Sequence, residues 1–360
     1  MNIPSPLIVR QNDPLNAGPP LDRLCQFQVT PNTLFFVRNH GSVPQVDAAA
    51  YRLAVDGQVA RPLTLSLDQL RDRFPQVTLT ATLQCAGNRR QELMAVQPIP
   101  GELAWDAEAI SNATWRGTPL QQVLDAAGVE TRPSQHVALT GLDETERQGH
   151  CFNFGGSIPL DKALNPEVLL AYEMNGEPLT PLHGYPLRLV VPGYIGARSV
   201  KWLSRITVQD APSNNYFQAR AYKLFPPQAR AENVDWDSGF MLGEMPVNAV
   251  ICAPAPQIKL SAGPTWMRGY ALAGGNRQVA RVDVSIDGGT NWSEAELLGE
   301  AQPWTWRLWR ALVQFQPGDH ELIVRAYDSA ANTQPEHAQS IWNFKGYMNN
   351  AWHRVHVQVL

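Results

Sequence analysis

Cys85 has the most distinctive chemical surroundings of any residue in this sequence. It ends an apolar, β-prone segment in the run Leu-Gln-Cys-Ala-Gly (83–87), and Arg89 and Arg90 follow closely. Adjacent guanidinium groups favour a thiolate, which is either a nucleophile or a ligand for a soft metal ion. Arginine forks also match the oxygens of a sulfate-like anion. The segment therefore predicts a thiolate beside an oxyanion pocket. The competing interpretation is a buried cysteine at a strand end.

Four other segments place basic and polar side chains at the ends of predicted strands. These segments are 35–41, 141–143, 182–188 and 192–202. They supply histidines, arginines, a lysine and glycines that let backbone N–H groups approach a ligand. No GxGxxG or GxxxxGK fingerprint occurs, no carboxylate pair stands out, and the surroundings of Cys85 do not match a cysteine protease. Together the segments fit a large phosphorylated cofactor that carries a metal.

The composition excludes several classes of protein. The 360 residues are 44% hydrophobic and 17% charged, which predicts a soluble protein with room for two domains. The net charge of −4 predicts no general attraction to nucleic acid or to an anionic membrane. The four cysteines form no CxxC pair, which argues against a zinc knuckle. No apolar run reaches the length of a membrane span and no leader is recognisable, so we expect a cytoplasmic protein, or a periplasmic one if a leader was removed.

The first two parts of the chain differ in pattern. Residues 1–30 are polar and Pro-rich and predict an arm laid over the surface. Residues 31–242 predict a mixed α/β domain. A capping box at Ser66 predicts a short helix through Phe74. Pro119 predicts the first position of another helix, which ends at Gly128, and the apolar run 186–191 predicts a buried strand.

Residues 243–360 predict an all-β sandwich. Apolar and polar residues alternate at 281–286, 304–308, 322–326 and 355–359, and Asp-Gly-Gly at 287–289 predicts a hairpin turn. Short alternating strands separated by turns are typical of an immunoglobulin-like sandwich. The predicted fold class is therefore α+β, with the mixed domain followed by an all-β immunoglobulin-like domain.

The motifs match, in order, those of one known family. They are Phe-Phe-Val-Arg-Asn-His (35–40), Gln-Cys-Ala-Gly-Asn-Arg-Arg (84–90), Leu-Ala-Tyr-Glu-Met-Asn-Gly (170–176), the run from Val-Pro-Gly to Lys-Trp (191–202) and Ala-Trp-His-Arg-Val-His-Val (351–357). Over residues 30–360 the chain resembles the molybdenum-cofactor domain of the sulfite oxidase family, followed by that family's immunoglobulin-like dimerisation domain. The N-terminus leaves no room for a cytochrome b5 domain, so the resemblance is to plant-type or bacterial members.

The resemblance implies roles for particular residues. Cys85 is expected to be the thiolate ligand of molybdenum. The molybdopterin is expected to contact a set of residues at strand ends: Phe36, Val37, Arg38, Asn39, His40, Asp143, His183, Arg188, Ser199, Val200 and Lys201. The sulfite and sulfate pocket is expected to contain Arg38, Arg90, Trp105, Tyr222 and Lys345.

The chain departs from the family pattern in three places. Ala221 stands where the family often has an acidic residue, just before Tyr222. Lys345 replaces the usual arginine of a Trp-Asn-Leu-Arg-Gly motif, which keeps the charge and loses the bidentate fork. The stretch 91–102 also differs, so the connection to Trp105 is less well predicted.

The resemblance implies molybdenum-dependent oxidation of sulfite to sulfate, by oxo transfer with two-electron reduction of the metal. Two alternatives stay open: reduction of nitrate, a sulfoxide or another oxo-compound at the same metal, and binding of the cofactor or an anion without turnover. We expect molybdenum-molybdopterin as the cofactor and no haem, because no Cys-x-x-Cys-His motif occurs. Electrons would leave to a separate acceptor, such as a cytochrome or oxygen. We also expect a homodimer through the C-terminal domain, and neither nucleic acid nor a membrane as partner.

Overall fold

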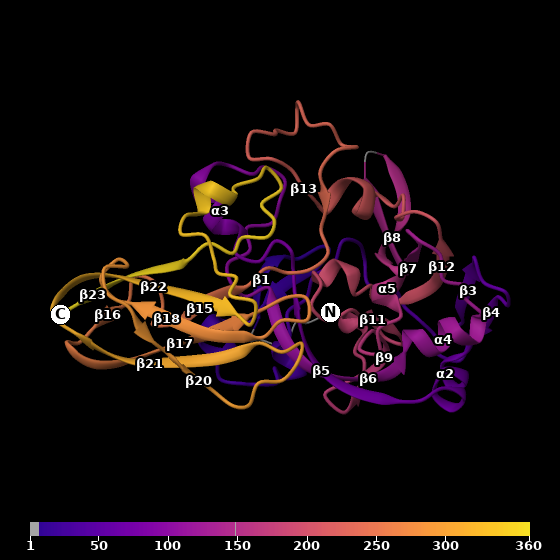
Figure 1. Ribbon diagram of the computed structural model, residues 1–360, viewed down its shortest axis with the longest axis horizontal. Helices are drawn as coiled ribbons and strands as arrows, with labels where there is room; N and C mark the ends of the chain where they lie inside the picture. Colours follow the sequence, from indigo (N-terminus) through magenta and orange to yellow (C-terminus); the bar gives the residue numbers. More distant parts are fainter. Residues whose placement is uncertain (1–6, 148) are drawn as a thin grey trace.

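The computed structural model describes residues 7–147 and 149–360, and these residues form a mixed α/β part followed by an all-β part (Figure 1). In Figure 1 the strands after β15 extend to the left, toward the C-terminus, and the mixed part lies to the right. The predicted order, an α/β region followed by a β-sandwich, is confirmed.

One sheet of the mixed part carries Cys85 at the end of a strand. Its order is β10-β9-β6-β5, with β11 paired to β9. The strands are β5 (Val77–Gln84), β6 (Ile110–Pro119), β9 (Leu169–Met174), β10 (Glu177–Pro178) and β11 (Arg188–Val190). The strand predicted at 186–191 is β11. Its residues are fully or almost fully buried, as expected for a short apolar run without alternation.

A second sheet of the mixed part has the order β4-β3-β12-β7-β8. The strands are β3 (Leu53–Gly57), β4 (Leu63–Leu65), β7 (His136–Arg147), β8 (His150–Pro159) and β12 (Leu203–Gln209). The β3 and β12 strands run parallel, and β12 pairs antiparallel with β7. A hairpin of β13 (Lys223–Leu224) and β14 (Phe240–Met241) follows.

The helices of the mixed part are short. They are α1 (Leu21–Leu24), α2 (Leu67–Arg73), α3 (Arg90–Val96), α4 (Leu120–Ala127) and α5 (Leu160–Ala163), with 3-10 turns η1 (Asn32–Leu34), η2 (Pro181–His183) and η3 (Gly196–Arg198) and a π-helical turn η4 (Phe217–Ala221).

The predicted helix signals at Ser66 and Gly128 are confirmed. The Ser66 hydroxyl accepts a hydrogen bond from the Gln69 N–H at 3.1 Å, and the Gln69 side chain accepts one from the Ser66 N–H at 2.9 Å. Gly128 closes α4 with a φ of 72°, a conformation that favours glycine. One detail is wrong: Pro119 is the N-cap of α4 rather than its first residue, because it still pairs as the last residue of β6.

The all-β part consists of two sheets packed face to face. One sheet has the order β15-β17-β21-β20, with β15 (Asn248–Ala253), β17 (Gly263–Leu272), β20 (Glu296–Leu297) and β21 (Arg307–Phe315). The other has the order β16-β23-β22-β18-β19, with β16 (Lys259–Leu260), β18 (Val279–Ser285), β19 (Ser293–Glu294), β22 (Gly318–Asp328) and β23 (His353–Val359). Inward residues of both sheets form one core, for example Val282, Trp309 and Val355. The 3-10 turn η5 (Ala338–Ile341) precedes β23.

The N-terminal segment reaches further into the core than an arm on the surface. Its hairpin of β1 (Ile8–Gln11) and β2 (Asn16–Gly18) bonds to the site segment through Ala17 and Val37, whose backbone groups pair at 2.8 and 3.0 Å. Ala17 and Leu24 have no exposed surface, and α1 packs against β15 of the sandwich. This segment therefore connects the two parts of the molecule.

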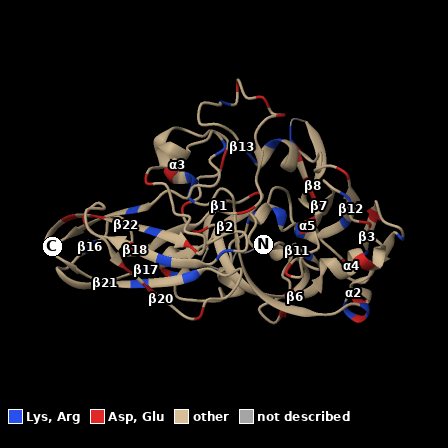
Figure 2. Cartoon of the chain, in the orientation of Figure 1, with Lys and Arg blue, Asp and Glu red and all other residues tan. Residues whose placement is uncertain are grey.

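Two surface properties complete the description. Acidic and basic residues are mixed over both parts of the chain (Figure 2). Among the described residues, no helix has both the length and the apolar character needed to cross a membrane.

Candidate active site

Cys85 lies in a tight turn directly after β5. Its N–H donates to the Ala109 carbonyl at 2.9 Å, and its own carbonyl accepts from the Asn88 N–H at 3.0 Å. The Gly87 N–H lies 3.4 Å from the sulfur and donates to it. The side chain is buried, with 6% of its surface exposed. The turn therefore fixes the position of the thiol and leaves one face of it toward a cavity.

Residues of the all-β part hold this turn in place through hydrogen bonds. The Met348 N–H donates to the Ala86 carbonyl at 2.8 Å, and the Asn88 side chain donates to the Tyr270 hydroxyl at 3.0 Å. Arg89 is fully buried and donates to Asn248 at 2.7 Å. Of the two arginines after Cys85, Arg89 thus points to the sandwich, and only Arg90 points toward the mouth of the site. Of the two arginines that the sequence places after Cys85, Arg89 therefore has a structural role and Arg90 is a candidate functional residue.

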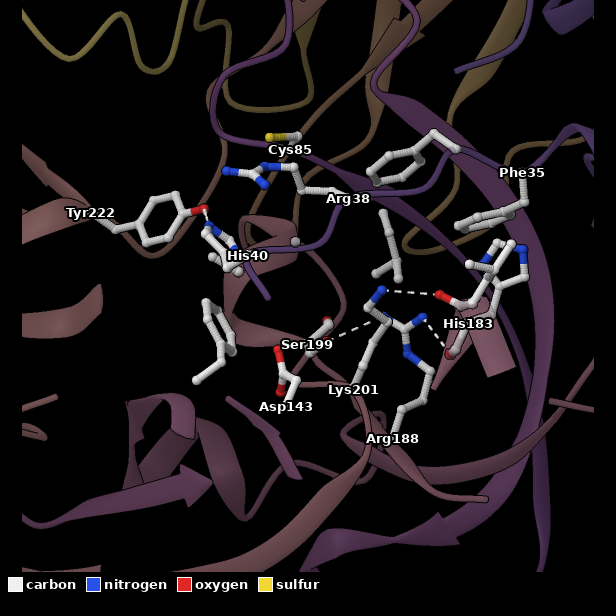
Figure 3. Close-up of a pocket in the computed structure, with 16 residues that line it drawn as sticks. Phe35, Arg38, His40, Cys85, Asp143, His183, Arg188, Ser199, Lys201 and Tyr222 are labelled. Atoms are coloured by element: carbon white, nitrogen blue, oxygen red, sulfur yellow. Dashed lines mark hydrogen bonds between the residues drawn. The ribbon is translucent and has the colours of Figure 1, made fainter. Parts of the chain in front are cut away.

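The thiol opens into a cavity between the two sheets of the mixed part (Figure 3). Most lining residues come from strand ends and the turns beside them, and two come from strand interiors. The full set is Phe35, Phe36, Arg38, His40, Leu83, Cys85, Asp143, Phe154, Leu182, His183, Arg188, Gly196, Ala197, Ser199, Lys201 and Tyr222. Eight of the expected cofactor contacts are in this set.

The inner end of the cavity carries two desolvated cations. Arg188 donates to the His183 carbonyl at 3.0 Å and to the Ser199 carbonyl at 3.1 Å. Lys201 donates to the Leu182 carbonyl at 2.9 Å and to the side chain of Asn39. Burial lowers the pKa of Arg188 to about 9 and the pKa of Lys201 well below its usual value. Cations held by neutral carbonyls favour binding of an anion such as a phosphate.

His183 is buried beside these cations and is neutral. Burial, followed by the charges of Lys201 and Arg188, lowers its pKa to about 3. Its ring packs edge-on against Phe35, with ring centres 5.3 Å apart. Its Nε2–H faces the Asn32 carbonyl at 3.4 Å, so Nδ1 remains as an uncharged acceptor for a ligand.

Asp143 faces the cavity from inside β7, not from the strand end that the sequence predicted. The pairing of β7 with β8 shifts register between Thr140 and Glu144, and such an irregularity turns a side chain out of the regular alternation. Its Oδ1 atom is buried without a hydrogen-bond partner. Burial raises the pKa of Asp143 to about 6, while Lys201 opposes this shift. Asp143 therefore presents an unused acceptor to any ligand in the cavity.

His40 and Tyr222 form a hydrogen bond close to Cys85. The Tyr222 hydroxyl and His40 Nε2 lie 2.8 Å apart. Burial lowers the pKa of His40 well below its usual value and raises the pKa of Tyr222. Both groups are thus uncharged, and the tautomer of His40 decides which of them donates.

A second cavity forms the mouth of the site and shares Arg38 and His40 with the first. Its lining residues are Gln11, Pro14, Arg38, Asn39, His40, Pro100, Gly101, Glu102, Leu103, Arg147, Tyr216, Phe217, Ala221, Lys345 and Tyr347. Lys345 reaches this mouth from the segment before β23, so the all-β part supplies a cation to a cavity of the mixed part. The resemblance implied that Lys345, in the run Trp-Asn-Phe-Lys-Gly (342–346), would lie in the sulfite pocket.

Four expected site residues do not line either cavity. Val37 and Val200 have 1% exposed surface, because side chains alternate along an extended chain. Phe36, Arg38 and His40 face the cavity, and Val37 faces the core. Ser199 and Lys201 likewise flank Val200.

The other two are Arg90 and Trp105. Arg90 is buried with its guanidinium over the Tyr347 ring, 5.1 Å from the ring centre. Trp105 is fully buried in the cluster that contains Cys85, and its indole N–H has no partner. Both side chains are therefore buried next to residues that line a cavity, Tyr347 and Cys85, and do not line a cavity themselves.

The donor set fits a metal-carrying cofactor better than a metal held by protein side chains. Among residues 7–147 and 149–360, no group of three or more histidine, cysteine or acidic side chains converges on a metal position. A metal near Cys85 would therefore take its remaining ligands from a cofactor. The unused Asp143 oxygen and the buried cations would suit the polar ring edge and the phosphate of a pterin.

Comparison with known proteins agrees with this geometry. Residues 40–217 match the Oxidoreductase molybdopterin binding domain, and residues 240–360 match the Mo-co oxidoreductase dimerisation domain. Sulfite oxidase of Gallus gallus is 45% identical over 357 residues, which cover 97% of this chain and 77% of that protein. The chain belongs to the sulfite oxidase family.

Further relatives extend the comparison. Mitochondrial sulfite oxidase of Homo sapiens is 46% identical over 98% of this chain, and the chain spans 66% of its length. The solved structure of the sulfane dehydrogenase SoxCD from Paracoccus pantotrophus aligns with a TM-score of 0.80 at 29% identity, covering 94% of this chain and 83% of that chain. An inducible nitrate reductase of Glycine max is 39% identical and the chain covers 41% of it. This family member thus combines the expected molybdopterin-binding and dimerisation domains.

Sequence reasoning missed two kinds of lining residue. Phe154, Leu182 and Ala197 carry no chemical signal, because apolar residues are equally common in any core. Glu102, Arg147 and Tyr347 line the mouth. For Glu102 a signal existed: it ends the 91–102 stretch that departs from the family pattern.

Proposed function

We propose that this member of the sulfite oxidase family binds molybdenum-molybdopterin and oxidises sulfite to sulfate. The observation that carries the proposal is the Cys85 thiol, which opens into a cavity lined by three cations, Arg38, Arg188 and Lys201, and by one carboxyl group, Asp143. The chain matches relatives named sulfite oxidase over nearly its full length, which supports the same conclusion.

The cofactor would supply the redox chemistry and the transferred oxygen. The protein would hold it at two ends. Cys85 would provide the single protein ligand of the metal. Arg188 and Lys201 would bind the anionic end, and Asp143 would accept hydrogen bonds from ring N–H groups. Of these groups, Asp143 Oδ1 is buried without a hydrogen-bond partner, and the two cations are buried against neutral groups.

Sulfite would enter through the mouth cavity, where Arg38 and Lys345 supply positive charge. Arg90 lies behind them and adds charge without lining the surface. With the Nε2–H tautomer of neutral His40, the hydroxyl of Tyr222 would accept from the imidazole and donate its own proton to an oxyanion beside Cys85. Fixed donors of this kind stabilise developing negative charge because they need no reorganisation during the reaction.

The decisive experiment combines metal analysis with steady-state kinetics. Purified protein should contain molybdenum and should reduce ferricyanide when sulfite is added. Protein that is loaded with molybdenum and inactive with sulfite would refute the proposal.

The two alternatives predict different results from the same preparation. A reductase would turn over nitrate or dimethyl sulfoxide with reduced viologen faster than it oxidises sulfite. A binding protein would hold the cofactor and sulfate without turnover in either direction. The nitrate reductase relative is more distant, at 39% identity against 45% and 46% for the two sulfite oxidases, which gives less support to the first of these.

The proposal also covers the assembly of the protein. A homodimer formed through residues 243–360, with an immunoglobulin-like sandwich, is supported by the match to a dimerisation domain. Electrons would leave to a separate acceptor, such as a cytochrome or oxygen, without a haem in this chain. Light scattering of the purified protein tests the dimer, and assays with cytochrome c and with oxygen test the acceptor.

A further inference from the structure

Glu102 places a carboxylate in the mouth of the candidate site. It lies in the loop between α3 and β6, and among the described residues that line the mouth cavity it is the only acidic one. Its Oε1 atom forms an ion pair with Lys345, and its Oε2 atom lies 3.6 Å from Nη2 of Arg90. Glu102 therefore contacts Arg90 and Lys345, two cations that we propose attract sulfite.

Arg90 is fixed and leaves one nitrogen for this contact. Its Nε donates to the carbonyls of Lys345 and Gly346 at 3.1 Å each, and its Nη1 donates to the Leu103 carbonyl at 2.9 Å. The remaining nitrogen, Nη2, faces Glu102. Because three of its contacts are to backbone oxygens, the charge of Arg90 stays in place when Glu102 moves.

Lys345 and Glu102 have more freedom. Their side chains are 17% and 18% exposed, so the pair reaches solvent on one side. Partly exposed ion pairs contribute little to stability, and lysine is a point charge on a flexible stem. An incoming oxyanion can therefore replace the carboxylate beside Lys345 at a small cost.

We propose that Glu102 is a specificity-determining residue that competes with oxyanions for Lys345 and Arg90. It occupies the position of an anion in the mouth cavity, and sulfite or sulfate must displace it. The pair also joins the mixed part to the all-β part, because Lys345 belongs to the segment before β23. This inference rests on the proposed function for the identity of the substrate, and on the ion pair for the competition.

The first test is Glu102→Gln, which removes the charge and keeps the shape. The Michaelis constant for sulfite and the inhibition constant for sulfate should both fall about twofold to fivefold, the range expected for a partly exposed ion pair. The kcat and the molybdenum content should stay unchanged. Glu102→Asp, which keeps the charge, should stay closer to the parent. Unchanged constants in Glu102→Gln would overturn the proposal.

Glu167→Gln is the matched control. Glu167 pairs with Lys162 at 2.6 Å, the two side chains are 13% and 8% exposed, and neither lines the described cavities of the site. Its loss should leave the constants for sulfite and sulfate at parent values. If Glu167→Gln lowers them as much as Glu102→Gln does, the effect is a general one of net charge and the proposal is wrong.

A double-mutant cycle identifies the route of the effect. In a Lys345→Met background, Glu102→Gln should change the sulfate constant less than in the parent, because one of its two partners is absent. An equal change in both backgrounds would exclude competition through Lys345.

Calorimetric titration of sulfate into cofactor-loaded protein gives the same comparison without turnover. A parent that binds sulfate and does not oxidise sulfite would refute the proposed function and would leave the Glu102 test intact. Equal sulfate affinity of parent and Glu102→Gln would refute the role of Glu102 alone.

Discussion

At the scale of single residues, position rather than type separates Cys85 from the other cysteines. Cys252 is as buried as Cys85, Cys25 is half-buried and Cys151 is exposed. Only Cys85 lies in a turn that directs its sulfur into a cavity with basic residues. Its chemistry is therefore a product of the end of β5 and of the loop that follows.

Replacing Cys85 by Ser should abolish sulfite oxidation. A hydroxyl is a harder and poorer ligand than a thiolate for this type of centre. The measurement is sulfite turnover per molybdenum, with circular dichroism to verify the fold. Cys252→Ser is the matched control, because it is also buried and lies outside the cavity. Parent-like turnover of the Cys85→Ser protein would remove Cys85 from the site.

Asp143 should cost stability in the cofactor-free protein at neutral pH. Its folded pKa of about 6 exceeds the ordinary value of 3.8, so the folded state binds more protons between these limits. Stability therefore falls as the pH rises from about 4 to 6, and the cost is fully present above pH 6. Asp143→Asn should raise the free energy of unfolding at pH 8 by about 2–3 kcal/mol and should lower the pterin content.

Urea unfolding of the cofactor-free protein and fluorescence of extracted pterin are the two measurements for Asp143. Glu108→Gln provides the control, because Glu108 is also buried with an unpaired oxygen and a raised pKa, away from the cavity. The assignment fails if Asp143→Asn retains the parent's pterin content.

At the scale of elements, the site residues lie on short strands and turns, whereas the capped helix α2 contributes to stability. The extended segment from Phe35 to His40 faces the cavity with every second side chain, and the irregularity in β7 adds Asp143. Helix α2 lies apart from the cavity and stabilises the mixed part through its capping box. The elements that line the cavity are thus different from the helix that stabilises the mixed part.

Ser66→Ala should therefore lower stability and leave activity unchanged. The substitution removes the hydrogen bond from the Gln69 N–H, and loss of such a cap costs about 1 kcal/mol. The checks are urea unfolding and the Michaelis constant for sulfite. A changed Michaelis constant would show that α2 is coupled to the site.

At the scale of the whole molecule, the contact between the two parts holds the turn after Cys85 and contains a buried histidine. His353 of β23 accepts a hydrogen bond from the Ile251 N–H at 3.2 Å through Nδ1, and its Nε2 lies 4.0 Å from Glu92 of α3. Burial lowers the pKa of His353 to about 4, although Glu92 opposes this shift. The fold thus requires the neutral imidazole.

Acid should weaken this contact through His353. Between pH 6.5 and about 4 the unfolded chain takes up a proton that the folded protein does not, so stability is lost as the pH falls through this window. The shift corresponds to about 3 kcal/mol at most. The parent should lose more unfolding free energy between pH 7 and pH 5 than His353→Gln does. His356→Gln, on the same strand with a 75% exposed side chain, should behave like the parent. Identical pH profiles for all three proteins would contradict the assignment.

The sequence by itself determined the features that depend on local pattern and on motif order. The capping box at Ser66, the closing glycine at 128, the sandwich strands at 281–286, 322–326 and 355–359 and the family were predictable, because each is written in neighbouring residues or in matched runs. The alternation predicted at 304–308 was wrong, because β21 begins only at Arg307 and residues 305–309 are all buried. Most polar residues of the inner cavity were predictable because they lie in runs that match the family motifs.

Only the tertiary structure decided which of these residues meet. It turned Arg89 to the sandwich and Arg90 to the mouth, because the left-handed conformation of Arg89 at the start of α3 sends the two side chains apart. It placed Val37 and Val200 in the core, since alternation in an extended segment allows only every second side chain to face one cavity. It also brought Glu102 to Lys345 across 243 positions of sequence. A contact between distant loops depends on the packing of whole sheets, and no local pattern encodes it.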